Sequence, residues 1–132
     1  MNTWKSTDAQ AMCAPQEVRI ATARRDGSLL RARTIWIVGD ADRVFIRSTN
    51  GRTADWFRAA ISTGRGQITA DGTAREVIFT EADDSDLPTV DAAFRAKYGR
   101  HASIVDHLLE AGPRAATLQI HPALIDSRRP AQ

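Results

Sequence analysis

The chain has 132 residues, 42% of them apolar and 26% charged, and 18 Lys and Arg against 16 Asp and Glu give a net charge of +2. This length and composition are typical of one globular domain. Two surplus positive charges are too few for a nucleic-acid footprint, so nucleic-acid binding is not expected. The single cysteine, Cys13, excludes an internal disulfide and a zinc site built on several cysteines.

The ends of the chain carry no targeting pattern. No apolar run approaches the roughly 20 residues that span a bilayer, and residues 1–15 lack the apolar core of a secretory signal peptide. We therefore expect a cytoplasmic protein with no membrane partner. Residues 1–16 are predicted to be a lead-in segment with at most a short helical turn, residues 17–122 the folded domain, and residues 123–132 a flexible tail.

Three antiparallel strands are predicted in the first part of the domain, over 17–25, 29–38 and 43–49. Apolar and polar residues alternate in the first, and β-branched residues gather at the end of the second. Asp26 and Gly27 between them are typical of a tight hairpin in which both residues have positive φ. Residues 39–42 form the second predicted turn.

Helical spacing replaces this alternation after the third strand. The predicted helix over 54–62 has one apolar side, with Thr53 as its N-cap. A second hairpin follows, with strands over 67–70 and 73–80 joined at Asp71 and Gly72.

Two further helices and a last strand complete the predicted domain. The first helix has an acidic start at 83–86, which suits the helix dipole and needs no metal ion. The second, over 103–110, turns Ile104 inward and ends at Gly112 and Pro113, before a strand over 115–121. The order β-β-β-α-β-β-α-α-β predicts a mainly β (α+β) domain whose six antiparallel strands close into a barrel.

The junction between the third strand and the first helix is the strongest candidate for a binding site. It holds two guanidinium groups, Arg47 and Arg52, two hydroxyls, Ser48 and Thr49, and the amide of Asn50. A helix start offers free N–H groups and a partial positive charge, and the surrounding side chains suit a phosphate. An ordinary strand–turn–helix connection with solvated arginines accounts for the same residues and stays open as the alternative.

Aromatic residues offer candidates for a ring-binding wall. Trp56 and Trp36 can each flank a planar ring or belong to the core, and Tyr98 with His101 can contact a ligand although Tyr98 also completes an apolar helix stripe. On the second strand, Arg31 and Arg33 share one face of the sheet, where they can reach a bound anion or face water, and water is the slightly favoured interpretation. No nucleophile–histidine–acid arrangement can be read from the order of residues, so no catalytic residue is predicted.

Several segments resemble the split-barrel flavin-binding superfamily, and most closely its deazaflavin-dependent nitroreductase branch. In that branch a strand ending in Ser precedes a Gly-containing turn, an aromatic pair and a short helix. The strand over 44–48, the turn over 50–53 and the pair Trp56 and Phe57 stand at those positions. Residues 34–38 and 96–98, with the same turn, are also similar to the domain-of-unknown-function family numbered 2255.

This resemblance implies a six-stranded split barrel, a homodimer, and FMN or coenzyme F-420 (a deazaflavin) bound in a groove for hydride transfer to a small organic substrate. The cofactor would contact Arg47, Ser48, Asn50, Arg52, Thr53 and Trp56. The substrate pocket would draw on Trp36, Tyr98 and His101. The open alternative is a cofactor-independent enzyme, such as an isomerase or cyclase, or a ligand-binding module; it is supported by residues 58–60, which replace the branch's His-Asn-Leu.

Overall fold

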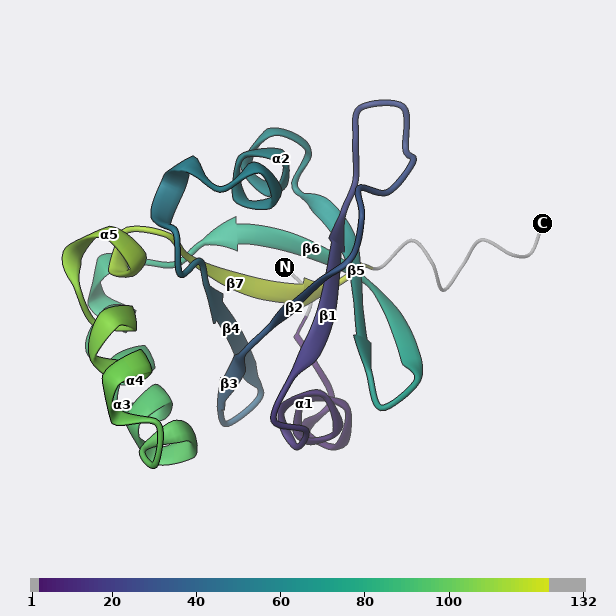
Figure 1. Ribbon diagram of the computed structural model, residues 1–132. Coiled ribbons are helices and arrows are strands. Elements are labelled where there is room, and N and C mark those ends of the chain that lie inside the picture. Colours follow the sequence, from purple (N-terminus) through teal and green to yellow (C-terminus); the bar gives the residue numbers. More distant parts are fainter. Residues whose placement is uncertain (1–2, 124–132) are drawn as a thin grey trace.

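Seven antiparallel strands form one sheet that curls into a nearly closed barrel in the computed structural model, which describes residues 3–123 (Figure 1). The order across the sheet is β2-β1-β5-β6-β7-β4-β3, so β2 and β3 are its edges. The strands are β1 Val18–Thr22, β2 Arg33–Ile35, β3 Ile37–Asp40, β4 Arg43–Arg47, β5 Arg65–Ala70, β6 Thr73–Glu81 and β7 Thr117–Pro122.

The prediction of six strands was wrong because the strand expected over 29–38 is interrupted at Trp36. Ile35 pairs with Val18 of β1 at one edge of the sheet, whereas Ile37 pairs with Ile46 of β4 at the other. Two residues that neighbour Trp36 therefore belong to opposite edges, and Trp36 crosses the gap between them. Apolar, β-branched residues occur on both sides of this interruption, so the sequence pattern does not indicate where one strand ends and the next begins.

Five α-helices cover the ends and one side of the barrel (Figure 1). The α2, α3 and α4 helices match the three predicted ones, while α1 and α5 were not predicted as helices. The α5 helix contains Gly112 and Pro113, which were expected to end the preceding helix; a proline in the first turn removes only an N–H that has no helical partner. The helices are α1 Ser6–Cys13, α2 Asp55–Thr63, α3 Leu87–Tyr98, α4 Ala102–Leu108 and α5 Ala111–Arg114.

The segment before β1 contributes to the barrel core. Trp4, Ala9 and Met12 are buried among the inward-facing residues of the strands, and the Trp4 Nε1–H donates a hydrogen bond to the Ile120 carbonyl over 2.8 Å. A second apolar cluster joins the outer face of β3 and β4 to α3 and α4; its buried members are Val38, Phe45, Val90, Phe94, Tyr98, Val105 and Leu108. The predicted tail falls, from residue 124 on, outside the described residues.

The two Asp-Gly hairpins differ. Asp71 and Gly72 both have positive φ, 52° and 80°, as predicted. In the first hairpin only Gly27 has a positive φ, 90°, and the Asp26 carboxylate instead accepts hydrogen bonds from the Ser28 N–H and hydroxyl. The Asp26 side chain thus stabilises the turn in place of a second left-handed residue. Within residues 3–123, no helix has both the length and the apolar character needed to cross a membrane.

Gly66 of β5 allows close packing inside the barrel. A Cβ atom at this position would lie 2.5 Å from the Ala21 carbonyl oxygen and 2.8 Å from a ring carbon of Phe79. We expect Gly66→Ala to lower the free energy of unfolding by about 2 kcal/mol, because backbone and ring must both shift. Denaturant unfolding followed by circular dichroism measures this change.

Gly112→Ala is the matched control, since a Cβ there meets nothing within 4 Å. We expect its free energy of unfolding to stay within about 0.5 kcal/mol of the wild type. Equal destabilisation by the two substitutions would contradict the close packing at Gly66.

Candidate functional site

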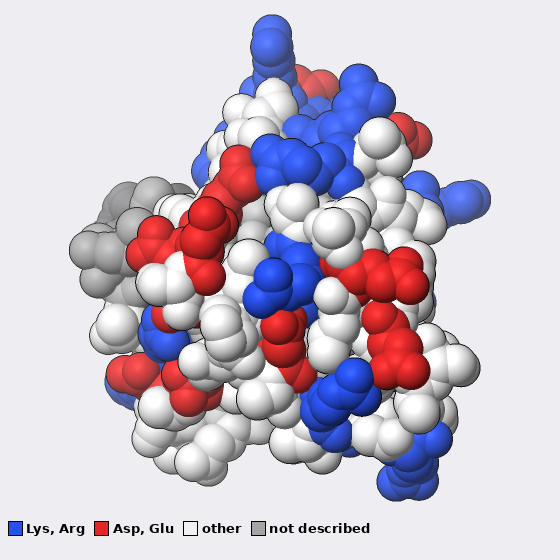
Figure 2. All heavy atoms as spheres, turned by 90° about the vertical axis from the view of Figure 1, so that its left-hand side faces the viewer, with Lys and Arg blue, Asp and Glu red and all other residues white. Residues whose placement is uncertain are grey.

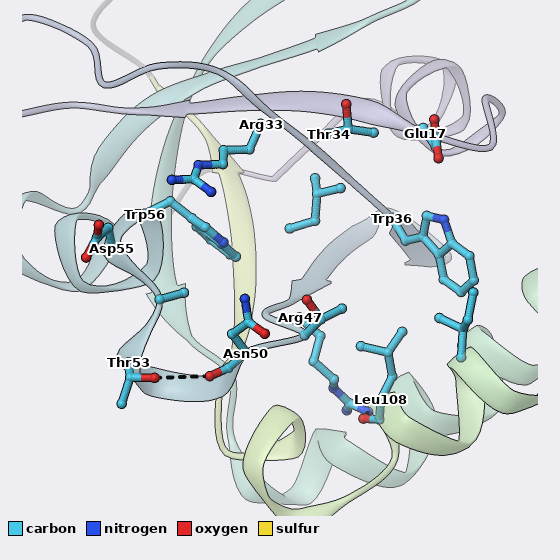
Figure 3. Close-up of a pocket in the computed structure, with 14 residues that line it drawn as sticks. Glu17, Arg33, Thr34, Trp36, Arg47, Asn50, Thr53, Asp55, Trp56 and Leu108 are labelled. Atoms are coloured by element: carbon cyan, nitrogen blue, oxygen red, sulfur yellow. Dashed lines mark hydrogen bonds between the residues drawn. The ribbon is translucent and has the colours of Figure 1, made fainter.

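A groove of about 850 Å³ lies beside the edge strand β2 and Trp36, the residue at which the β-structure is interrupted (Figure 3). Strand β2 forms one side, the end of β4 and the start of α2 form another, and α4 closes the third. It is lined by Glu17, Arg33, Thr34, Ile35, Trp36, Arg47, Thr49, Asn50, Thr53, Ala54, Asp55, Trp56, Ile104 and Leu108.

Apolar side chains form much of the groove wall. Trp56 and Trp36 lie toward opposite ends of the groove (Figure 3). Ile104 of α4, which was predicted to turn inward, is 46% exposed and lines the groove instead. Two indoles and aliphatic side chains around a space of this size are typical of a site for a small planar molecule.

Arg47 lies at the groove, but its guanidinium is held by the protein. The side chain has no exposed surface, and it donates hydrogen bonds to the Thr117 hydroxyl (2.8 Å), the Asp91 carboxylate (2.8 Å) and the Leu108 carbonyl (3.0 Å). The remaining nitrogen, Nη2, is enclosed and has no acceptor within residues 3–123. In Figure 3 the guanidinium runs toward Leu108 and away from Trp56.

Asp91 of α3 compensates two arginines at once. Its carboxylate accepts hydrogen bonds from Arg47 and from Arg114, whose Nη2 lies 2.9 Å away. Burial alone would raise the pKa of Asp91, but the hydrogen bonds and charges of Arg114 and Arg47 outweigh it and hold that pKa below its usual value. Burial also lowers the pKa of Arg47, which the bond to Asp91 opposes. The charge of Arg47 is therefore balanced locally.

Arg52 does not line the groove. Its guanidinium lies 2.7 Å from the Glu81 carboxylate, donates to the Ala115 carbonyl over 2.8 Å and stacks over the Phe57 ring at 5.1 Å. The two arginines that the sequence placed together as an anion site are thus both paired with carboxylates, and they face different parts of the molecule.

The remaining polar residues of the predicted site divide in two. Asn50 and Thr53 line the groove, whereas Ser48 is buried behind it, and its hydroxyl has no hydrogen-bond partner within the described chain. Thr53 is not the N-cap of α2: Ala54 holds that position, and the Thr53 hydroxyl donates to the Asn50 carbonyl over 3.3 Å (Figure 3). The Gly51–Thr53 segment forms a turn of 3-10 helix that delays the start of α2.

Arg33 borders the groove, although the sequence slightly favoured a position that faces water. It is exposed, lines the groove at the same end as Trp56, and forms no ion pair with any residue of the described chain (Figure 3). Alternation along the strand placed it on the side facing water, and only the curl of the barrel shows that this side borders the groove. Glu17 and Asp55 are the carboxylates that line it.

Trp36, Tyr98 and His101 lie together, but only Trp36 reaches the groove. The Trp36 and Tyr98 rings stack in parallel with centroids 3.8 Å apart, and His101 is tilted against Trp36 at 5.7 Å. Burial raises the pKa of Tyr98 to about 12, and its hydroxyl donates to the Gln16 carbonyl over 2.6 Å. Tyr98 therefore supports the indole from behind and stays protonated.

Nucleophile and metal chemistry have little support in residues 3–123. These residues contain no group of three or more His, Cys, Asp and Glu side chains placed to hold a metal ion. Cys13 lies in a separate cavity of about 410 Å³ with Lys97, and burial raises the pKa of its thiol. A protonated thiol is a weak nucleophile.

We expect the Arg47–Asp91 pair to stabilise strongly the helical side, which is the side of the barrel covered by α3, α4 and α5. Asp91→Asn leaves the buried Arg47 charge uncompensated, so we expect the free energy of unfolding to fall by about 3 kcal/mol. The matched control is Asp106→Asn, which removes the partner of the exposed Arg95 and should change it by less than about 1 kcal/mol. Chemical denaturation measures both, and equal losses would contradict the special role of the buried pair.

The same pair predicts a pH dependence. Because the pKa of Asp91 is lower in the folded chain than in the unfolded one, its contribution is complete above the unfolded value of about 4 and is lost as the pH falls through the folded value. The difference in unfolding free energy between wild type and Asp91→Asn should be constant between about pH 7 and pH 5 and shrink below about pH 4. Denaturation at several pH values measures it, and a difference that persists in acid would contradict this linkage.

Comparison with solved structures places this geometry in a known fold. The haem storage protein HutZ from Vibrio cholerae superposes with a TM-score of 0.67 at 14% identity, over 93% of this chain and 92% of that one. An F420-H2 dependent reductase gives 0.61 at 10% identity over 80% and 94%. A FAD-binding protein from Mesorhizobium loti gives 0.52 at 15% identity over 90% and 88%. At these identities the likeness establishes the fold.

Sequence comparison establishes the family. No curated protein sequence matches the chain. Residues 8–120 match the family described as "Uncharacterized protein conserved in bacteria (DUF2255)", which covers the barrel and all five helices almost completely. The chain therefore belongs to the DUF2255 family, and it shares its split-barrel fold with these solved structures.

Proposed function

We propose that the groove binds a planar heteroaromatic cofactor, FMN or a deazaflavin such as coenzyme F-420, and that the protein is a reductase of small organic molecules. The observation that carries this proposal is the groove itself: about 850 Å³ beside the break in the barrel, with an indole toward each end and an unpaired arginine at one of them. The fold relatives support it, since one is named as an F420-H2 dependent reductase and another as a FAD-binding protein.

The two indoles of the groove suit the ring of such a cofactor. Trp56 is held at the start of α2, and Trp36 is held by its parallel stack on Tyr98, so neither indole is free to fill the groove. Rigid aromatic walls bind a flat ring with little loss of side-chain entropy. A third tryptophan, Trp4, is buried in the barrel core and does not line the groove.

The polar half fits an anionic end group through a different set of donors from the predicted one. Arg47 and Arg52 are engaged with Asp91 and Glu81, so Arg33 supplies the positive charge, with Asn50 and Thr53 as hydrogen-bonding neighbours. A guanidinium without an ion pair beside an indole of the groove suits a phosphate or carboxylate.

When bound, the cofactor supplies the hydride chemistry, and the chain supplies binding, orientation and exclusion of water. Trp36, Trp56 and Leu108 keep water from the ring-binding part of the groove. Tyr98 remains protonated and directs its hydroxyl to a backbone carbonyl, so it takes no part in proton transfer at neutral pH. Glu17 and Asp55 are the carboxylates that border the groove.

Haem is less well matched to this groove. Two relatives of the same fold are named as haem proteins. Among the described residues, however, no His, Cys, Met or Tyr side chain lines the groove, and these are the side chains that ligate haem iron.

Binding experiments with matched arginine variants test the proposal. Quenching of Trp36 and Trp56 fluorescence should give saturable binding of FMN or coenzyme F-420 to the purified protein. Arg33→Gln should weaken binding of the cofactor by about tenfold, since it removes a charge-assisted contact. Arg52→Gln, which changes the charge equally outside the groove, should leave the affinity within about twofold.

The outcomes separate the candidates. Loss of binding in Arg52→Gln but not in Arg33→Gln would restore the site expected from the sequence and contradict the geometry. Absence of quenching by both cofactors up to tens of micromolar would refute the flavin proposal and favour a cofactor-independent use of the groove. A haem titration serves as the third arm, for which we expect no spectrum of ligated iron.

A further inference from the structure

The hairpin between β1 and β2 stands out from the barrel as an ordered arm (Figure 1). We call residues 24–32 the arginine arm. Most of its residues are exposed, while Leu30 and Ala32 are half-buried. The Arg24 N–H donates to the Ser28 carbonyl over 2.8 Å, and the Arg24 guanidinium donates hydrogen bonds to the Ser28 hydroxyl and the Leu29 carbonyl. With the bonds of Asp26 to Ser28, the turn is fixed by its own polar groups rather than by packing.

Of the eight arginines that form no ion pair within residues 3–123, four lie in or beside this arm, and the other four are Arg19, Arg58, Arg65 and Arg100. Elsewhere the arginines that pair with carboxylates are Arg43, Arg47, Arg52, Arg75, Arg95 and Arg114. Arg24, Arg25 and Arg31 of the arm, and Arg33 at its base, form no ion pair within residues 3–123. Lys and Arg side chains gather at the top of Figure 2, at the height where the arm stands in Figure 1.

The arm runs directly into the groove. Arg33 lines the groove at the Trp56 end, and Arg31 precedes it by two residues in the segment that leads into β2, so the two Cα atoms are at most about 7 Å apart. Long, flexible arginine side chains from positions this close can converge on one phosphate group. Arg24 and Arg25, beyond the turn, act on it over a longer range.

We propose that the arginine arm captures the phosphorylated tail of the ligand whose ring occupies the groove, with Arg31 and Arg33 as its clamp. This inference rests on the proposed function for the ring, but it adds the chemical class of the tail and the surface that receives it. Guanidinium groups bind phosphate through paired hydrogen bonds. A positive arm beside the groove also raises the rate at which an anionic ligand enters.

Two flavins that share a ring and differ in a phosphate test the clamp. Stopped-flow quenching of tryptophan fluorescence gives the association rate and the affinity for FMN and riboflavin. In Arg31→Gln we expect the affinity for FMN to fall about tenfold and that for riboflavin to change by less than about twofold. The association rate of FMN should fall about threefold at low salt, and this difference should disappear near 0.5 M salt.

Arg95→Gln is the control, because it removes the same charge from α3, where Arg95 pairs with Asp106 at the surface. It should leave the affinities and the association rates of both flavins within about twofold of the wild-type values. If Arg95→Gln and Arg31→Gln lower the association rate of FMN equally, the effect comes from net charge and the clamp is refuted. If the wild type binds FMN and riboflavin alike, with equal rates, the clamp is also overturned.

A probe without a ring separates this inference from the flavin proposal. Tripolyphosphate titrated into the labelled wild-type protein should shift the backbone amide signals of residues 27–33 in nuclear magnetic resonance spectra, and Arg31→Gln should weaken that binding about tenfold. If neither flavin binds while tripolyphosphate does so, the proposed function fails and the phosphate-binding arm stands. If tripolyphosphate binds wild type and Arg31→Gln equally, the arm is refuted whatever the flavins do.

Discussion

The burial of one guanidinium determines how the helical side is attached to the barrel. Arg47 ends β4 with no exposed side-chain surface, and its hydrogen bonds reach β7 through Thr117, α3 through Asp91 and α4 through the Leu108 carbonyl. An uncompensated charge at this depth costs several kcal/mol, so these acceptors must be in place together. Since Leu108 also lines the groove, the contacts that neutralise Arg47 position one wall of the binding site.

The groove exists because one chain segment serves both edges of the sheet. Ile35 and Ile37 pair with different neighbours at opposite edges, and the intervening Trp36 has no place in either ladder. Its indole instead stacks on Tyr98 behind and borders the groove in front. A closed barrel with a continuous strand here would have no such opening, so the break in β-structure and the site have the same origin.

The local parts of this structure were predictable from the sequence, and the distant pairings were not. The hairpin at Asp71 and Gly72 depends on two adjacent residues, and helix α2 depends on spacing within nine residues. Arg47 and Arg52, in contrast, find their carboxylates 44 and 29 residues away. The sequence shows that a guanidinium is present near a helix start, but its availability to a ligand depends on where a remote acid lies once the barrel is closed.

Pairing also explains how a nearly neutral chain can carry a local positive surface. The net charge is only +2, yet carboxylates pair with arginines such as Arg47, Arg52 and Arg114, whereas Arg25, Arg31 and Arg33 form no ion pair within residues 3–123. The aromatic wall is anchored by α2 and Tyr98, while the free guanidinium groups belong to an edge strand and its hairpin. Because separate elements supply the two halves of the groove, affinity for a ring and affinity for an anion can vary independently in this fold.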